Sequence, residues 1–131
     1  MKSMRFLFVI LLGSLILYGC AQRPKKTGII EGHVTIGPLT PVVREGEIQP
    51  TPNPEVYAAR EVVIFKSDGT TVFTRLKIDA NGNYQAELPV GKYIVDINHS
   101  GIDRASGLPM TVEIAENAVT RVDINIDTGI R

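Results

Sequence analysis

The sequence predicts an all-β protein, a single seven-stranded antiparallel β-sandwich. From residue 27 onward, apolar and polar residues alternate, which places every second side chain on the same face of a strand. Clusters of glycine, asparagine and aspartate interrupt this alternation at regular intervals, as turns between strands do. No stretch of the region repeats its apolar residues with the helical period of 3.6. Strands with one buried and one solvated face are typical of two packed antiparallel sheets.

The expected strands follow one another along the whole region. The second one is continuously apolar, which favours a strand that is covered on both faces. In the third, the alternation places Val72 on the buried face and Phe73 on the solvated face. The seven expected strands are 29–36, 62–65, 72–78, 83–88, 92–98, 110–114 and 121–126.

The apolar faces of these strands predict the hydrophobic core. Large aliphatic and aromatic side chains recur at every second position, where a half-buried strand points them inward. The expected core residues are Val34, Ile64, Leu76, Tyr84, Leu88, Tyr93, Val95, Val112, Ile114, Val122 and Ile124.

Turn residues separate the strands. Asp68-Gly69 stands between the second and third strands, and this dipeptide is a strong signal for a tight hairpin. Segments 79–84 and 88–93 each place a glycine where the chain must reverse, and Glu116-Asn117 separates the last two strands.

One segment, residues 37–60, interrupts this rhythm with 24 residues that include five prolines. A connection of this length in a small domain is either functional or mobile. The run PTPNP favours an extended polyproline geometry that could bind an aromatic groove of a partner. The alternative is a proline-stiffened cover over one end of the sandwich. The candidate partner contacts are Pro50, Pro52, Pro54 and Tyr57.

The first 18 residues have the pattern of a secretion signal. Lys2 and Arg5 precede an uncharged run of 13 residues, Phe6–Tyr18. A helix needs about 20 apolar residues to span a bilayer, so this run is too short for a stable span. We therefore expect the protein to be exported.

The residues that follow refine this expectation. Leu17-Tyr18-Gly19-Cys20 resembles the lipobox of bacterial lipoproteins. The resemblance implies a signal peptide over residues 1–19, cleavage after Gly19, and lipid on Cys20 that anchors the chain in a membrane. It further implies a lipidated tether over 20–26, after which the alternating segment forms the expected β-sandwich domain over 27–131. Ala21 resembles the sorting signal of Gram-negative outer-membrane lipoproteins, which implies a domain that faces the periplasm.

Composition excludes one class of partner. Removing Lys2 and Arg5 from the 14 basic residues leaves 12 against 14 acidic residues, a net charge of −2. Because nucleic-acid binding requires a basic surplus, no nucleic-acid partner is expected. An envelope protein or a glycan remains open as the partner.

The run DANGNYQAELPVGKYIVDI, residues 79–97, resembles the carboxypeptidase regulatory-like domains, relatives of the transthyretin-like sandwiches. Asp79, Gly82 and Tyr84 match the first part of their motif, and the residues Leu88, Pro89, Gly91 and Tyr93 match the second. The resemblance covers residues 28–126 and implies the fold. It brings no activity, because such domains commonly serve as accessory modules.

We expect a non-catalytic structural or binding module. The alternative is an envelope hydrolase of transthyretin-like type that uses His33 or His99. The transthyretin-like enzyme 5-hydroxyisourate hydrolase ends in Tyr-Arg-Gly-Ser, whereas this chain ends in Thr-Gly-Ile-Arg. His99, Ser100 and Asp103 include the residue types of a catalytic triad, but they lie within one turn, where immediate neighbours rarely converge. No metal or cofactor is expected, because the potential calcium loop from Asp79 lacks its sixth-position glycine and twelfth-position glutamate.

Overall fold

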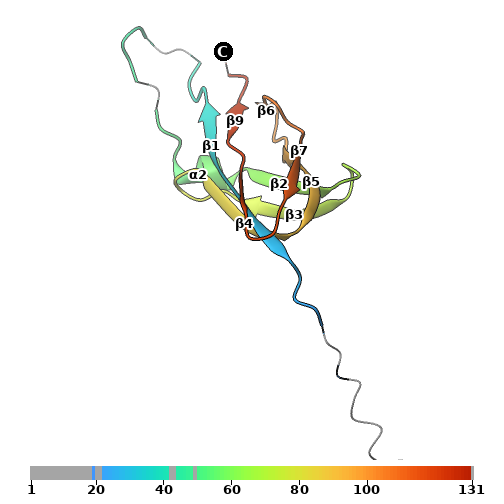
Figure 1. Ribbon diagram of the computed structural model, residues 1–131. Helices are drawn as coiled ribbons and strands as arrows, with labels where there is room; N and C mark the ends of the chain where they lie inside the picture. The colour runs from blue at the N-terminus through green and yellow to red at the C-terminus, as the bar shows by residue number, and fades with distance from the viewer. Residues whose placement is uncertain (1–18, 20–21, 42–43, 49, 131) are drawn as a thin grey trace, which may run out of the picture.

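The computed structural model describes residues 19, 22–41, 44–48 and 50–130. Within these residues the chain forms two β-sheets and one short helix (Figure 1). The first five strands are β1 (Thr27–Gly37), β2 (Glu61–Lys66), β3 (Val72–Lys77), β4 (Asn83–Pro89) and β5 (Gly91–Ile97). The last four are β6 (Arg104–Ala105), β7 (Met110–Ile114), β8 (Val119–Arg121) and β9 (Ile124–Asp127), and the helix is α2 (Pro54–Ala58).

The two sheets form a β-sandwich, which confirms the all-β class. One sheet has the strand order β4-β1-β9-β6 with β8 also beside β1, and the other has the order β3-β2-β5-β7. The expected count of seven strands is wrong. In the described part of the chain there are nine strands, because β6 was not expected and the last expected strand, 121–126, is divided into β8 and β9.

The expectation of a purely antiparallel arrangement is also wrong. β8 and β9 both run parallel to β1, and they keep a constant register: Ile29 lies opposite Val119, and Val34 lies opposite Ile124. The reversal after β7 brings the chain back beside the start of β1, where Ile29 donates its N–H to the carbonyl of Ala118. From that position the final strand can follow β1 only in the same direction.

The ladder between β1 and its parallel neighbour is interrupted at Gly32 and His33. The carbonyl of Val122 lies over Gly32, so close that a Cβ on Gly32 would come within 1.8 Å of the Val122 oxygen. The Tyr84 hydroxyl donates a hydrogen bond to this same carbonyl. The Asp123 carboxylate accepts from the His33 N–H at 2.8 Å, so a side chain replaces the missing ladder bond. Glycine at position 32 is therefore required for β8 and β9 to lie against β1.

A β-bulge in the second sheet disturbs the alternation of faces in β3. The register of β2 and β3 shifts between Ile64 and Phe65. Beyond the shift, Val72 is 41% exposed and Phe73 is 39% exposed, and the ring of Phe73 packs edge-on against Tyr93 at a centroid distance of 5.3 Å. The expected burial of Val72 is therefore wrong, because one extra residue in a strand disrupts its alternation.

The core occupies the space between the sheets. Ten of the eleven expected core residues are buried, and Leu76 is half-buried and packs against the same cluster. Val62, Val63 and Ile64 are all buried, which confirms that β2 is covered on both faces. The cluster also contains the residues Ile30, Ile36, Tyr57, Val62, Ile78, Ile97 and Ile126.

The proline-rich segment contains the helix that the sequence pattern did not indicate. Pro54 occupies the first turn of α2, where its missing N–H costs nothing, and the Asn53 side chain caps the helix by accepting from the Val56 N–H at 3.0 Å. Continuous polyproline geometry through Pro54 is therefore wrong. Five residues are too few to show a 3.6-residue period, so only the capping residues could have indicated this helix.

β1 extends along the sandwich and defines its two ends. The chain enters at Thr27, which we call the tether end, and β1 finishes at Gly37, which we call the loop end. Figure 1 shows the N-terminal segment leaving at the tether end, whereas the proline-rich segment and the C-terminal residues lie together at the opposite end. An eleven-residue strand covers about 36 Å at 3.3 Å per residue, so the two ends are well separated.

We expect Gly32→Ala to destabilise the fold by about 1–3 kcal/mol or more, because the new methyl group would overlap the Val122 carbonyl. Urea unfolding followed by circular dichroism measures this change. Thr35→Ala, at an exposed position of the same strand, is the control and should change the stability by no more than about 0.5 kcal/mol. Equal stability of the two variants would contradict the assigned close approach.

Candidate functional site

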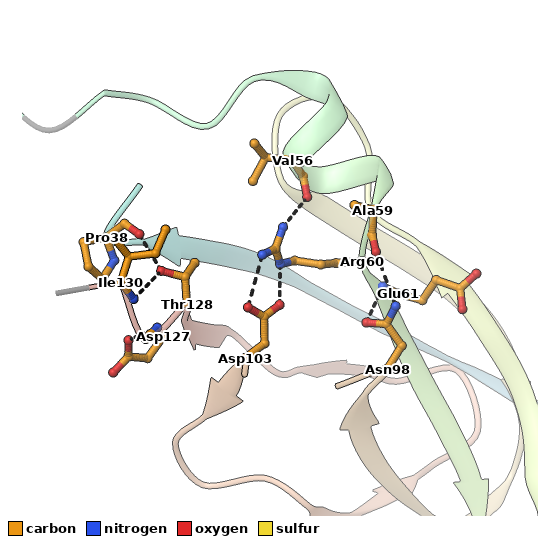
Figure 2. Close-up of polar contacts among 11 residues, drawn as sticks. Pro38, Val56, Ala59, Arg60, Glu61, Asn98, Asp103, Asp127, Thr128 and Ile130 are labelled. Carbon is orange, nitrogen blue, oxygen red and sulfur yellow. Dashed lines mark hydrogen bonds and ion pairs between the residues drawn. The ribbon is translucent and has the colours of Figure 1, made fainter. Parts of the chain in front are cut away.

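The loop end of the sandwich is the candidate site, because four segments that are distant in sequence meet there. They are residues 37–38 after β1, helix α2, the connection 98–109 between β5 and β7, and residues 128–130 (Figure 2). Hydrogen bonds and one ion pair join these segments, so their arrangement is defined by side chains as well as by the sheets.

A buried ion pair, Arg60 with Asp103, joins the end of α2 to the connection between β5 and β7. Two guanidinium nitrogens meet the two carboxylate oxygens, at 2.7 Å for Nε–Oδ2 and 3.2 Å for Nη2–Oδ1. Nη1 of Arg60 also donates to the Val56 carbonyl at 2.9 Å, which fastens the guanidinium to the helix. Only 14% of the Arg60 side chain and 5% of the Asp103 side chain are exposed. A bidentate pair of this kind holds both partners in one geometry (Figure 2).

Two further contacts brace the same end. The Asn98 side chain accepts from the Glu61 N–H at 3.2 Å and so joins the connection after β5 to the start of β2. The Thr128 hydroxyl donates to the Pro38 carbonyl, and the Thr128 N–H donates to the Gly37 carbonyl at 3.1 Å. The C-terminal residues are therefore attached to the first residues of the proline-rich segment.

Apolar side chains are exposed on this braced end. Ile48 is 96% exposed, Ile102 is 69% exposed and Ile130 is 38% exposed. Ile102 lies over Gly129, whose backbone leaves it room, and a small hollow of about 280 Å³ lies between Ile102, Arg104, Asp127 and Gly129. A contiguous exposed apolar patch is typical of a protein contact site, and Ile102 and Ile130 are the candidates for one at this end.

The residues expected to contact a partner differ in their exposure to solvent. Pro50 and Pro54 are exposed and Pro52 is half-buried, so these prolines are accessible, and their contact with a partner stays a prediction. Tyr57 is only 5% exposed and belongs to the core cluster, where its ring lies close to Gly82. Because α2 turns its ring inward, Tyr57 offers little surface to a partner, and its expected contact with one stays a prediction.

The two histidines lie apart in different parts of the sandwich. His33 is in β1 of the first sheet, and its Nδ1 is 2.9 Å from Asn83 Oδ1 in β4. His99 follows β5 of the second sheet, and its Nε2 is 3.1 Å from Asp96. That hydrogen bond raises the pKa of His99 above its usual 6.5, with smaller contributions from Asp103 and an opposing one from burial. The Asp103 carboxylate is bound by Arg60, so the residues considered for a triad do not assemble.

A second hollow, about 480 Å³, lies on the outward face of the first sheet. It is open and polar, and its charged members are Glu31, Lys77, Asp79 and Arg121. Arg121 is already engaged by Asp123 at 3.1 Å and approaches Glu31 at 3.9 Å. The hollow offers mixed hydrogen-bonding groups rather than a concentrated charge of one sign.

Metal binding and membrane spanning have no structural support in the described ranges. No group of three or more metal-ligating residues occurs among the residues that the structure describes. The same residues contain no helix that is long and apolar enough to cross a membrane. Cys20, the expected lipid-attachment residue, and Ala21 lie outside the described residues.

Comparison with solved structures shows the fold. The chain is similar to GBS52, the minor pilin of the Gram-positive pathogen Streptococcus agalactiae, with a TM-score of 0.54 and 14% identity over 79% of this chain and 45% of that chain. It is also similar to a DUF3823 family protein from Parabacteroides merdae, with a TM-score of 0.47 and 14% identity over 78% of this chain and 46% of that chain. The chain thus spans a little under half the length of these proteins.

No protein-family model matches the chain, and no curated protein matches it either. The likeness to GBS52 is a likeness of fold alone. The resemblance to the carboxypeptidase regulatory-like domains stays a prediction from residues 79–97.

We expect Asp103→Asn to destabilise the protein by about 3–5 kcal/mol, because it leaves the Arg60 guanidinium buried without its counter-charge. Urea unfolding measures the loss. Glu61→Gln is the matched control, because it breaks the exposed ion pair between Glu61 and Arg75. The Glu61 side chain is 34% exposed and the Arg75 side chain is 52% exposed, so the loss of this pair should cost about 0–1 kcal/mol. A similar cost for both variants would show that the Arg60–Asp103 pair does not brace the loop end.

Proposed function

We propose that this protein is a non-catalytic structural or binding module of the bacterial cell envelope, anchored by lipid on Cys20, which presents its loop end to a protein partner. The observation that carries the proposal is the placement of the two ends. The tether leaves from one end of the sandwich, and the braced, partly apolar surface lies at the other end. A rigid spacer that holds a contact surface away from its anchor needs this arrangement.

The loop end fits a partner better than a substrate. Its exposed groups include isoleucines and prolines, which can bind a partner by burying apolar surface, and its buried charged pair is already satisfied internally. The shared fold of the minor pilin GBS52 supports a structural role at a cell surface. In a Gram-negative host, Ala21 after the anchored cysteine would place the domain on the periplasmic face of the outer membrane.

The hydrolase alternative has less support. General acid–base catalysis requires a base within hydrogen-bonding reach of a nucleophile or a bound water. His33 lies in the first sheet and His99 follows the second, and their side-chain partners in the described region are an asparagine and an aspartate. A substrate screen with the purified protein tests this alternative: turnover that His33→Ala or His99→Ala abolishes would replace the present proposal.

The lipid anchor has a direct test. We expect the chain purified from bacterial membranes to begin at Cys20 and to carry the added mass of a diacylglycerol, because Leu17–Cys20 resembles a lipobox. Intact-mass spectrometry measures both properties. The variant Cys20→Ser should remain uncleaved and unlipidated, and a native chain that starts at Met1 without added mass would refute the anchor.

The partner contact is tested by photo-crosslinking in cells. A crosslinkable residue at Ile102 or Pro50 should capture one specific species, because both positions are exposed at the loop end. The same probe at exposed Lys92, the second residue of β5 near the tether end, is the control and should not capture it. Replacing Pro50, Pro52 and Pro54 with serine should abolish capture; equal capture from Lys92 and Ile102 would contradict the proposal.

A further inference from the structure

The tether end of the sandwich is built by two turns that bind the last residues of the tether. The Val90 N–H, in the turn between β4 and β5, donates to the Lys26 carbonyl at 3.0 Å. The Asn117 N–H, in the turn between β7 and β8, donates to the Thr27 carbonyl at 3.0 Å. Lys26 Nζ also lies 3.4 Å from Glu116. The point where the tether joins the domain is therefore ordered, and the two turns surround it.

These turns carry apolar side chains that the core does not use. Val90 is 45% exposed, and Val119, just after the second turn, is 59% exposed. Val119 pairs with Ile29 across the strands, and a hollow of about 300 Å³ beside them is lined by Ile29, Ala118 and Val119 among other residues. The fold does not require an exposed valine at position 90, in a turn where polar residues are usual, or at position 119, where the side chain of β8 faces solvent.

Basic residues accompany the valines. Arg23, Lys25 and Lys26 are all exposed in the tether, directly before the sandwich. A basic segment beside exposed apolar side chains suits an anionic lipid surface, where the charges meet headgroups and the apolar groups enter the boundary with the acyl chains.

The length of the tether limits what can cover this end. Six residues separate Cys20 from Thr27, and six extended residues reach about 20 Å at most. With Cys20 in the membrane, the valines at the tether end must stay close to the headgroups. This step depends on the lipid anchor of the proposed function.

We propose that the tether end, marked by Val90, Val119 and Lys26, docks on the lipid headgroup layer of the membrane that holds the anchor. Docking fixes the orientation of the sandwich, so the loop end points away from the membrane. The domain then keeps one orientation relative to the membrane and does not rotate freely about its tether.

Single tryptophans test the docking, because the natural sequence contains none. The full chain carrying Val90→Trp or Val119→Trp is purified from the membranes of a lipoprotein-processing bacterium. It is then reconstituted into phosphatidylethanolamine–phosphatidylglycerol vesicles that contain brominated lipid. Ile102→Trp, at the exposed loop end, is the matched control. Flotation of the vesicles reports separately whether the chain is anchored.

We expect the bromine to quench about half or more of the emission at positions 90 and 119, because only side chains at the membrane interface meet the acyl chains. Emission at position 102 should not change. If the chain floats with the vesicles but positions 90 and 119 are quenched no more than position 102, docking is overturned and the anchor stands. If the chain does not float, the anchor fails and docking fails with it. A concentration-dependent blue shift of positions 90 and 119 without quenching would show that a second copy covers this end, which also overturns docking.

Discussion

The close approach of the Val122 carbonyl to Gly32 is the constraint on which the rest of the fold depends. It allows the final strand to lie against β1, and it is secured by the Tyr84 hydroxyl from β4 on the other side of β1. Three strands thus meet at one glycine. Any larger residue would push β8 and β9 away from β1, because a Cβ has no room beside a backbone oxygen. Burial also raises the pKa of Tyr84, which favours the protonated hydroxyl that donates this hydrogen bond.

β1 is paired on both edges, with β4 on one side and with β8 and β9 on the other, and it runs from one end of the domain to the other. It begins between the two turns that bind the tether and ends where the proline-rich segment and the C-terminal residues meet. The pair of Arg60 and Asp103 then attaches α2 to the connection between β5 and β7, so the loop end is ordered by side chains as well as by strands. In the proposed envelope module, the tether end is attached to the membrane anchor and the loop end faces a protein partner.

The candidate site could be predicted from the sequence only in part. The prolines and their exposure follow from composition, because a proline-rich connection cannot enter a sheet. Tyr57 and Asp103 could not be placed in this way. Tyr57 looked like a contact residue, yet a single turn of helix directs its ring into the core. Asp103 looked like a turn residue beside His99, yet its partner is Arg60, 43 positions away in the sequence. No local pattern records such a pairing, since it arises only when α2 folds back over the end of the sandwich.

The sequence by itself determined the fold class, the seven segments that enter strands and nearly all of the core, because the period of two that points side chains inward is a local property of the chain. Tertiary structure alone decided the direction of the last strand, its division into β8 and β9, and the exposure of Val72 at the bulge. These features depend on which strands become neighbours. The alternation of residues indicates that a strand has a buried face. Which strand lies beside it is determined by backbone contacts between segments that lie far apart in the sequence.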